Sequence, residues 1–323
     1  MWYYYIIVIK LEDSFIDYSS EKQYKVLAAS VSMEGVLVAL AIPFRDGKVD
    51  VEGLGRHVSS LVKEGVNGFF PLGTTSMGVL LNVEERRIAL ETISENSNGL
   101  PIVVQVGSTD WSTVVETVKL AEKFNAEAIA SIVPIYYKPD YDTIKLYFSK
   151  LNQLTSLPIF IYNIPGNVGF NVTPDLVARL IKDGVSVGGV KDSSGDIGQV
   201  MRFVEMGLEV FNGSDHIVTL ATLVGAKGCI SALSNSVTGP VIESYRLVKD
   251  GDVKGALKAQ SLVAKVRDLA SKYPKPAVYY SLVKLLKYDF GGVKEPLVRN
   301  LTREEETELA AELSKLGLKV RFN

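Results

Sequence analysis

Hydrophobic and polar positions alternate regularly along most of the chain. From Gly35 onward, short apolar runs alternate with longer segments in which apolar residues recur every three or four positions. Short apolar runs are typical of strands buried on both faces, and the longer periodic segments are typical of helices that cover a sheet. The short runs predict eight strands, over residues 36–42, 68–71, 102–106, 128–133, 158–162, 185–190, 209–211 and 228–231.

Amphipathic segments lie between these runs. Asp110 and Thr173 stand directly before two of the segments, where helix N-caps are expected. Eight strands with intervening helices predict an α/β fold, a (β/α)8 TIM barrel. A doubly wound sheet usually has fewer units and a glycine-rich phosphate turn near its start. The predicted helices between the strands cover residues 51–64, 83–96, 110–124, 141–154, 173–182, 199–206 and 217–224.

The two ends of the chain differ from this pattern. Residues 236–323 contain further helical segments, which predict a C-terminal helical extension packed on a barrel of residues 34–235. Residues 1–33 begin with a short aromatic and β-branched run, which is too short to span a bilayer and lacks the features of a signal peptide. We interpret residues 1–33 as an appendage, or alternatively as an extra strand or an oligomer contact.

Composition excludes several classes of protein. The chain has 323 residues, of which 47% are hydrophobic and 22% are charged, and a net charge of -2. No basic block indicates nucleic-acid binding, and no apolar run suits a transmembrane helix. Cys229 is the only cysteine, and His57 and His216 are the only histidines, so thiolate and histidine-rich metal sites are excluded. We therefore expect a cytoplasmic protein that needs no metal.

A lysine stands at the end of the sixth apolar run. Val190 is followed by Lys191 and then by a turn of small and polar residues. A cation at the end of a buried strand is costly, and desolvation favours the neutral amine, which is a nucleophile toward carbonyl carbons. The alternative is an exposed lysine that begins a loop, because most lysines are exposed.

Polar residues also stand at the ends of four other predicted strands. In (β/α)8 barrels the active site lies at the carboxyl ends of the strands. Each placement alone has a simpler explanation, such as a turn, a helix cap or a packed ring, but together they favour a functional site around Lys191. The residues are Gly73, Thr74 and Thr75 after the second strand, Tyr136 and Tyr137 after the fourth, Tyr162 and Asn163 at the fifth, and Gly213, Ser214 and Asp215 after the seventh.

Three of these segments resemble a known family. Gly73-Thr74-Thr75, Tyr162-Asn163-Ile164-Pro165 and Val190-Lys191-Asp192 have the order and spacing of the dihydrodipicolinate synthase/N-acetylneuraminate lyase family. The resemblance covers residues 35–313. It implies a (β/α)8 barrel and a class I aldolase, which forms a Schiff base, or a related enzyme.

The resemblance implies a role for each site residue. Lys191 would form an imine with pyruvate or another 2-oxo acid, whose carboxylate Thr74 and Thr75 would bind. Tyr162 would be the general acid and base, and Thr75 and Tyr136 would complete its proton relay. In some relatives the matching tyrosine serves a neighbouring subunit, so we expect a homo-oligomer, a dimer or a tetramer, with no cofactor beyond the imine. The substrate-binding residues would be Gly73, Thr74, Thr75, Asn167, Gly213, Ser214, Asp215 and Ile230.

Other positions depart from the best-known relatives. Dihydrodipicolinate synthases carry an arginine two residues after the motif proline to hold a carboxylate, and this chain has Asn167. N-acetylneuraminate lyases usually have serine at the position of Thr74 and an acidic residue at that of His216. The Ser-Met-Gly stretch at residues 76–78 is similar to that of archaeal 2-keto-3-deoxygluconate aldolases. These departures favour a polyhydroxylated, uncharged aldehyde tail.

The sequence leaves four hypotheses for the function. We expect reversible aldol cleavage of a 2-keto-3-deoxy sugar acid to pyruvate and an aldehyde. The alternatives are a condensation of pyruvate with an aldehyde, of the 4-hydroxy-tetrahydrodipicolinate synthase type, and a dehydration through the same imine. The fourth is a non-catalytic paralogue that binds a 2-oxo acid, in which Ser76 and Met77 misplace the relay.

Overall fold

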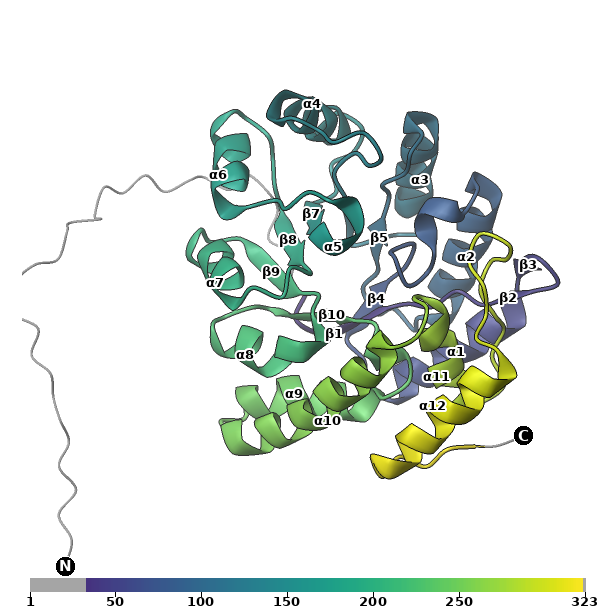
Figure 1. Cartoon of the computed structure of the whole chain (residues 1–323). Helices are drawn as coiled ribbons and strands as arrows, with labels where there is room; N and C mark the ends of the chain where they lie inside the picture. The colour runs from purple at the N-terminus through teal and green to yellow at the C-terminus, as the bar shows by residue number, and fades with distance from the viewer. Residues whose placement is uncertain (1–32, 322–323) are drawn as a thin grey trace, which may run out of the picture.

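Eight parallel strands form a nearly closed barrel in the computed structural model, which describes residues 33–321 (Figure 1). The strands are β1 (Gly35–Ala39), β4 (Gly68–Phe70), β5 (Val103–Gln105), β6 (Ala128–Ser131), β7 (Ile159–Asn163), β8 (Gly189–Asp192), β9 (Glu209–Asn212) and β10 (Gly228–Ser231). They pair in the order β4-β1-β10-β9-β8-β7-β6-β5, and a parallel bridge between Phe69 and Ile102 joins β4 to β5. The predicted TIM barrel is confirmed.

Helices surround the barrel where amphipathic segments were predicted. The side chains of Asp110 and Thr173 accept hydrogen bonds from backbone N–H groups of the first helical turn, which confirms both as N-caps. The helices are α1 (Val51–Lys63), α2 (Val83–Asn96), α3 (Trp111–Lys123), α4 (Tyr141–Asn152), α5 (Pro165–Val168), α6 (Pro174–Lys182), α7 (Ile197–Glu205), α8 (Val218–Leu223), α9 (Thr238–Lys249), α10 (Val253–Ser271), α11 (Ala277–Leu286) and α12 (Arg303–Lys315). A small hairpin of β2 (Phe44–Arg45) and β3 (Lys48–Val49) precedes α1.

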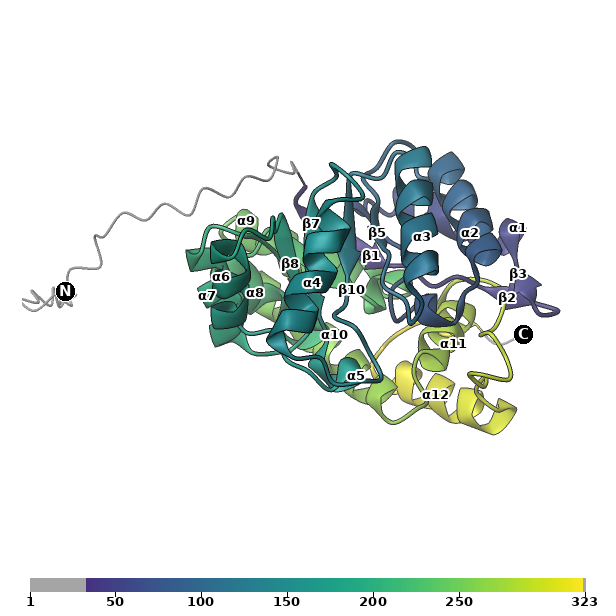
Figure 2. The same cartoon turned by 90° about the horizontal axis from the view of Figure 1, so that it is seen from above.

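The last four helices follow β10 without a further strand. α9 packs against β1, β10 and α10. Figure 2 shows α10, α11 and α12 together on one side of the barrel. The boundary predicted at residue 235 stays a prediction, and the interpretation of residues 1–33 falls, except for Met33, outside the described residues. None of the helices between residues 33 and 321 combines the length and apolar character needed to cross a membrane.

The core has two layers because successive side chains of a strand point to opposite faces. One layer fills the barrel interior and includes Phe70, Phe160 and Phe211, while the other lies between strands and helices. The sixth strand begins at Gly189, later than predicted, because the N–H of Val185 donates to a carbonyl of α6. It extends through Lys191, so this lysine lies within the strand.

Candidate active site

A cavity of about 670 Å3 lies at the carboxyl ends of the barrel strands. It brings together every residue to which the family resemblance gives a catalytic or binding role, except Tyr136. Tyr137 and Asn163, which also stand at strand ends, do not line it. The predicted residues that line it are Gly73, Thr74, Thr75, Tyr162, Asn167, Lys191, Gly213, Ser214, Asp215 and Ile230.

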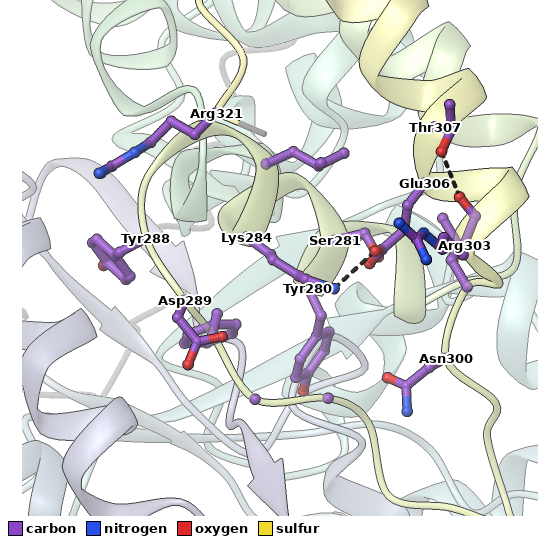
Figure 3. A pocket seen from close by; sticks show the side chains of 15 residues that line it. Tyr280, Ser281, Lys284, Tyr288, Asp289, Asn300, Arg303, Glu306, Thr307 and Arg321 are labelled. Carbon is purple, nitrogen blue, oxygen red and sulfur yellow. Dashed lines mark hydrogen bonds and ion pairs between the residues drawn. The ribbon is translucent and has the colours of Figure 1, made fainter. Parts of the chain in front are cut away.

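A second cavity, of about 790 Å3, lies among α11, α12 and the segments beside them (Figure 3). It shares no lining residue with the first cavity within the described part of the chain. Its lysine, Lys284, forms an ion pair of 2.8 Å with Glu306, which also accepts a hydrogen bond from Ser281. Because this lysine is already paired with a carboxylate, whereas Lys191 forms no ion pair among the described residues, we place the active site in the cavity around Lys191.

Lys191 is buried between two aromatic rings. Its side chain is 2% exposed, and Nζ lies 3.7 Å from the ring centroid of Phe70 and 3.9 Å from that of Tyr162. Burial lowers the pKa of Lys191 well below its usual range, and the charge of Asp215 only partly opposes this. Desolvation therefore favours a neutral, nucleophilic amine, while the ring faces can stabilise a cation formed later on the same nitrogen.

The register of the strands places Lys191 beside two aromatic residues. Lys191 pairs with Tyr162 of β7 on one side and with Phe211 of β9 on the other. Residues paired in this way project to the same face of the sheet, here the barrel interior. Gly189, two residues earlier on that face, leaves no room for a side chain, since a Cβ atom there would lie 2.3 Å from the ring of Phe160.

The phenol of Tyr162 contacts a threonine hydroxyl. Its oxygen lies 3.3 Å from Oγ1 of Thr74. Burial raises the pKa of Tyr162 to about 12, and the hydroxyls of Thr74 and Ser193 oppose this increase. The relay partner predicted from the sequence was Thr75, whereas the hydroxyl that lies within reach of the phenol is that of Thr74. The part of Thr75 in a relay stays a prediction. Thr75 is instead held through its backbone, because its carbonyl accepts a hydrogen bond of 3.0 Å from Tyr280.

A tight loop between β4 and α2 presents these threonines. Leu72 and Met77 have φ angles of 61° and 59°, in the left-handed region, and the N–H of Gly78 donates to the carbonyl of Gly73 over 2.9 Å. A Cβ atom on Gly78 would lie 1.6 Å from the carbonyl oxygen of Leu72. The fully buried Arg86 donates to the carbonyl of Gly78 over 2.8 Å and anchors the loop to α2.

Two buried carboxylates lie near Lys191, one on the outer face of β8 and one in the cavity. Asp192 lies on the outer face of β8, where Asn163 and Gln199 donate to it over 2.7 and 3.1 Å and so connect β7, β8 and α7. Asp215 lines the cavity and accepts a hydrogen bond of 2.5 Å from Ser231. Burial raises the pKa of both carboxyls. The hydrogen bonds of Asp192 support the strand, and Asp215 is the acid whose charge acts on the pKa of Lys191.

Tyr136 does not reach the cavity of its own chain. Its side chain is 90% exposed, its φ angle is 75°, and its ring packs at 5.1 Å against that of Tyr137, which is also exposed. The predicted relay of Tyr162 with Tyr136 is therefore not formed within one chain, because the loop after β6 turns this side chain outward.

Sequence reasoning missed part of the lining. Ser193 follows the lysine motif directly and could have been included from its position. Arg267 and Tyr279 come from α10 and α11, and Lys275 from the connection between them. The periodicity of these helices gave no sign of which face meets the barrel. Between residues 33 and 321, no cluster of three or more His, Cys, Asp or Glu side chains could hold a metal ion.

Barrel and buried amine together place the chain among the carbon–carbon lyases that form a Schiff base. More closely, it belongs to the dihydrodipicolinate synthetase family, whose model matches residues 32–316.

Known relatives perform more than one reaction. The chain is 32% identical over 293 residues to the 4-hydroxy-tetrahydrodipicolinate synthase of Methanopyrus kandleri, across 88% of this chain and 97% of the relative. A variant of the Sulfolobus solfataricus 2-keto-3-deoxygluconate aldolase matches with a TM-score of 0.81 and 25% identity, covering 88% and 96%. The dihydrodipicolinate synthase of Thermotoga maritima also gives a TM-score of 0.81 and 25% identity, covering 88% and 99%. The overall fold therefore does not separate cleavage from synthesis.

Proposed function

We propose that the protein cleaves a 2-keto-3-deoxy sugar acid reversibly to pyruvate and an aldehyde, through an imine on Lys191. The observation that carries this proposal is the position of the Lys191 amine, buried between Phe70 and Tyr162 in the cavity. Burial supplies the neutral nucleophile that imine formation requires.

The reaction begins with attack of the Lys191 nitrogen on the C2 carbonyl of the substrate. Tyr162 carries a proton from nitrogen to oxygen, and a second proton, taken from solvent, leaves with that hydroxyl as water and gives a protonated imine. The C3–C4 bond then breaks and its electron pair forms the enamine. As the aldehyde leaves, the C4 hydroxyl passes its proton to Tyr162, which passes its own proton on through Thr74 to solvent. Protonation of C3 and hydrolysis release pyruvate and restore the amine. The hydroxyls and backbone amides around Thr74 and Thr75 hold the pyruvate carboxylate throughout.

Tyr162 transfers protons as a neutral phenol. Because burial raises its pKa to about 12, it keeps its proton at neutral pH. It can give that proton to one oxygen while it receives another through the hydroxyl of Thr74, which lies 3.3 Å away. The phenol and the hydroxyl therefore act together, and neither has to carry a charge.

Condensation of pyruvate with an aldehyde is the second candidate, favoured by the name of the Methanopyrus kandleri relative. Asn167 lines the cavity without supplying a cation at that position, which favours cleavage. The proposal includes a homo-oligomer, a dimer or a tetramer, in the cytoplasm and without a metal or organic cofactor.

Trapping with pyruvate tests the imine. The protein is incubated with pyruvate and borohydride, and the adduct is located by digestion and mass spectrometry. We expect one adduct, on Lys191, and none in Lys191→Ala. An adduct on another lysine, or full activity of Lys191→Ala, would show that the mechanism is wrong. A panel of aldehydes and keto-deoxy acids then separates cleavage from condensation.

A further inference from the structure

The connection between α11 and α12 contacts the loop that carries the motif threonines. Gly292 of this connection exchanges two backbone hydrogen bonds of 2.9 Å each with Phe44, which fixes it on the hairpin of β2 and β3. Farther along, Val298 lines the catalytic cavity, which the loop between β4 and α2 also lines. Lys294 stands between these two points of the sequence, so its backbone is held on the side of Gly292.

Lys294 makes three contacts with the loop and with the first turn of α2. Its backbone N–H donates to Sδ of Met77 over 3.2 Å, and its ammonium donates to the carbonyl of Leu80 over 2.9 Å. The ammonium also forms an ion pair of 2.5 Å with Glu85. The two side chains of this pair are only 18% and 15% exposed, so solvent screens it less than a surface pair. One residue therefore ties the loop to the start of α2.

A second cation holds the same stretch of the loop. The guanidinium of the buried Arg86 donates to the carbonyl of Gly78 over 2.8 Å and to that of Leu81 over 3.1 Å. Hydrogen bonds from charged donors are among the stronger ones in proteins. Arg86 anchors the loop from α2, whereas Lys294 anchors it from the C-terminal part of the chain, so the end of the loop is fixed by two separate elements.

Hydrogen bonds within the loop connect these anchors to the relay. The N–H of Met77 donates to the carbonyl of Thr74 over 3.0 Å. The hydroxyl of Thr74 lies 3.3 Å from the phenol oxygen of Tyr162, near the upper limit for a hydrogen bond. A shift of Met77 would therefore move Thr74 and lengthen a contact that proton transfer requires. Among the described residues that line the cavity, Lys294 is not included, so it acts on the site only through the loop.

We infer that Lys294 is a positioning residue for the proton relay of Tyr162 and Thr74. Because this relay belongs to the proposed function, the inference rests on that function. It gives a part in the reaction to a residue outside both the barrel and the cavity lining. Without the ammonium, the carbonyl of Leu80 and the carboxylate of Glu85 lose their common donor, and the loop is held only by Arg86.

Proton exchange of pyruvate tests the inference without an aldehyde. Formation of the enamine from the imine releases a C3 proton, so the enzyme should introduce deuterium into the methyl group of pyruvate in D2O. The rate at saturating pyruvate is measured by NMR and divided by the fraction of Lys191 that pyruvate and borohydride label. We expect Lys294→Met to lower this rate per labelled site about 10- to 100-fold, because small displacements of catalytic groups cost this much. Lys294→Arg should restore most of it.

A merely structural role gives a different result. If Lys294 only stabilises the fold, labelling and exchange fall together, and the rate per labelled site stays unchanged, which overturns the inference. Lys284→Met is the matched control, because this lysine forms an ion pair of 2.8 Å with Glu306 away from the loop. It should leave the rate per labelled site unaffected, and a loss equal to that of Lys294→Met would also contradict the inference.

A double variant tests whether Lys294 and Glu85 act as one unit. Glutamine at position 85 keeps an oxygen for the backbone N–H of Asn82, which the Glu85 side chain now accepts over 2.8 Å, but removes the charge that faces Lys294. Glu85→Gln should lower the rate less than Lys294→Met, because the contact with Leu80 remains. The double variant should be no slower than Lys294→Met alone. Losses that multiply in the double variant would show that the two residues act independently.

Amide hydrogen exchange separates the inference from the proposed function. We expect the amides of residues 76–82 to exchange about tenfold or more faster in Lys294→Met than in the wild type, and those of α3 to stay unchanged. Equal exchange in the two proteins contradicts the inference whatever the activity. If pyruvate and borohydride give no label in the wild type, the proposed function fails, and this measurement alone decides whether Lys294 positions the loop.

Discussion

Lys191 and Tyr162 face each other across β7 and β8, and burial moves their pKa values in opposite directions. The pKa of the amine falls well below its usual range, and that of the phenol rises to about 12. Desolvation therefore favours the amine without its proton, while the phenol keeps its proton near neutral pH. This is the pair of states needed for attack on a carbonyl followed by proton transfer to its oxygen.

The buried amine should lower the stability of the protein. The pKa of Lys191 is lower in the folded chain than in the unfolded chain. At a pH between these two pKa values, the unfolded chain therefore binds more protons than the folded chain. The free energy of unfolding consequently decreases as the pH falls from the unfolded pKa toward the folded pKa. We expect Lys191→Met to raise the free energy of unfolding at pH 7 by about 1–3 kcal/mol, and the gain to shrink toward pH 10. Denaturant unfolding at both pH values measures it, with the exposed Lys272→Met as control. If Lys191→Met gives no gain in the free energy of unfolding, or a gain that does not change with pH, Lys191 does not have a lowered pKa in the folded protein.

The two motif threonines should have separable roles. Thr74→Val removes the hydroxyl beside Tyr162, so we expect kcat to fall about 100-fold with little change in the KM for pyruvate. Thr75→Val should lower kcat less and raise the KM for pyruvate, because Thr75 lines the cavity and the family resemblance implies that it binds the carboxylate. Steady-state kinetics of the two variants compare them directly. A larger loss of kcat in Thr75→Val would restore the relay predicted from the sequence.

Among the elements, the loop between β4 and α2 has a backbone that leaves little room for substitution. Gly78 cannot carry a Cβ atom without displacing the carbonyl of Leu72, 1.6 Å away. We expect Gly78→Ala to lower the free energy of unfolding by about 2–4 kcal/mol and to lower kcat, since the loop carries Thr74. Gly239→Ala is the control, because it lies in α9 with open space around its Cβ position. Equal unfolding midpoints for the two variants would contradict this account of the loop.

Element positions were largely predictable from the sequence, and side-chain directions were not. Helix α2 has the bounds that apolar periodicity predicted, because one of its faces is buried. The choice between Thr74 and Thr75 depended on a loop with left-handed residues, where no regular period fixes which side chain points inward. The place of Arg267 in the cavity wall depended on how α10 meets the barrel, which the periodicity of one helix does not specify.

At the scale of the whole molecule, two distant parts of the chain line the cavity. The barrel supplies Lys191 and Tyr162, while α10 and its connection to α11 supply Arg267 and Lys275. The reactive amine therefore belongs to the barrel, and the C-terminal helices share in the wall around it. This arrangement is consistent with a family in which one barrel supports cleavage in some members and synthesis in others.

The position of Tyr136 bears on how two subunits form one active site. It is 90% exposed and is not part of its own cavity, whereas the family resemblance implies a role for this tyrosine in a proton relay. Both observations agree if Tyr136 enters the site of a neighbouring subunit. We expect Tyr136→Phe to lower kcat about 10- to 100-fold, and Lys191→Ala to abolish activity.

Mixing these two variants tests the shared site. In a hybrid dimer, the subunit that keeps Lys191 lacks its own Tyr136 hydroxyl but receives one from its partner, so one of two sites is complete. Random reassociation of equal amounts should therefore restore about a quarter of wild-type activity, because half of the dimers are hybrid. Each variant mixed with itself is the control. If the mixture shows only the average of the two separate activities, Tyr136 acts within its own chain or not at all.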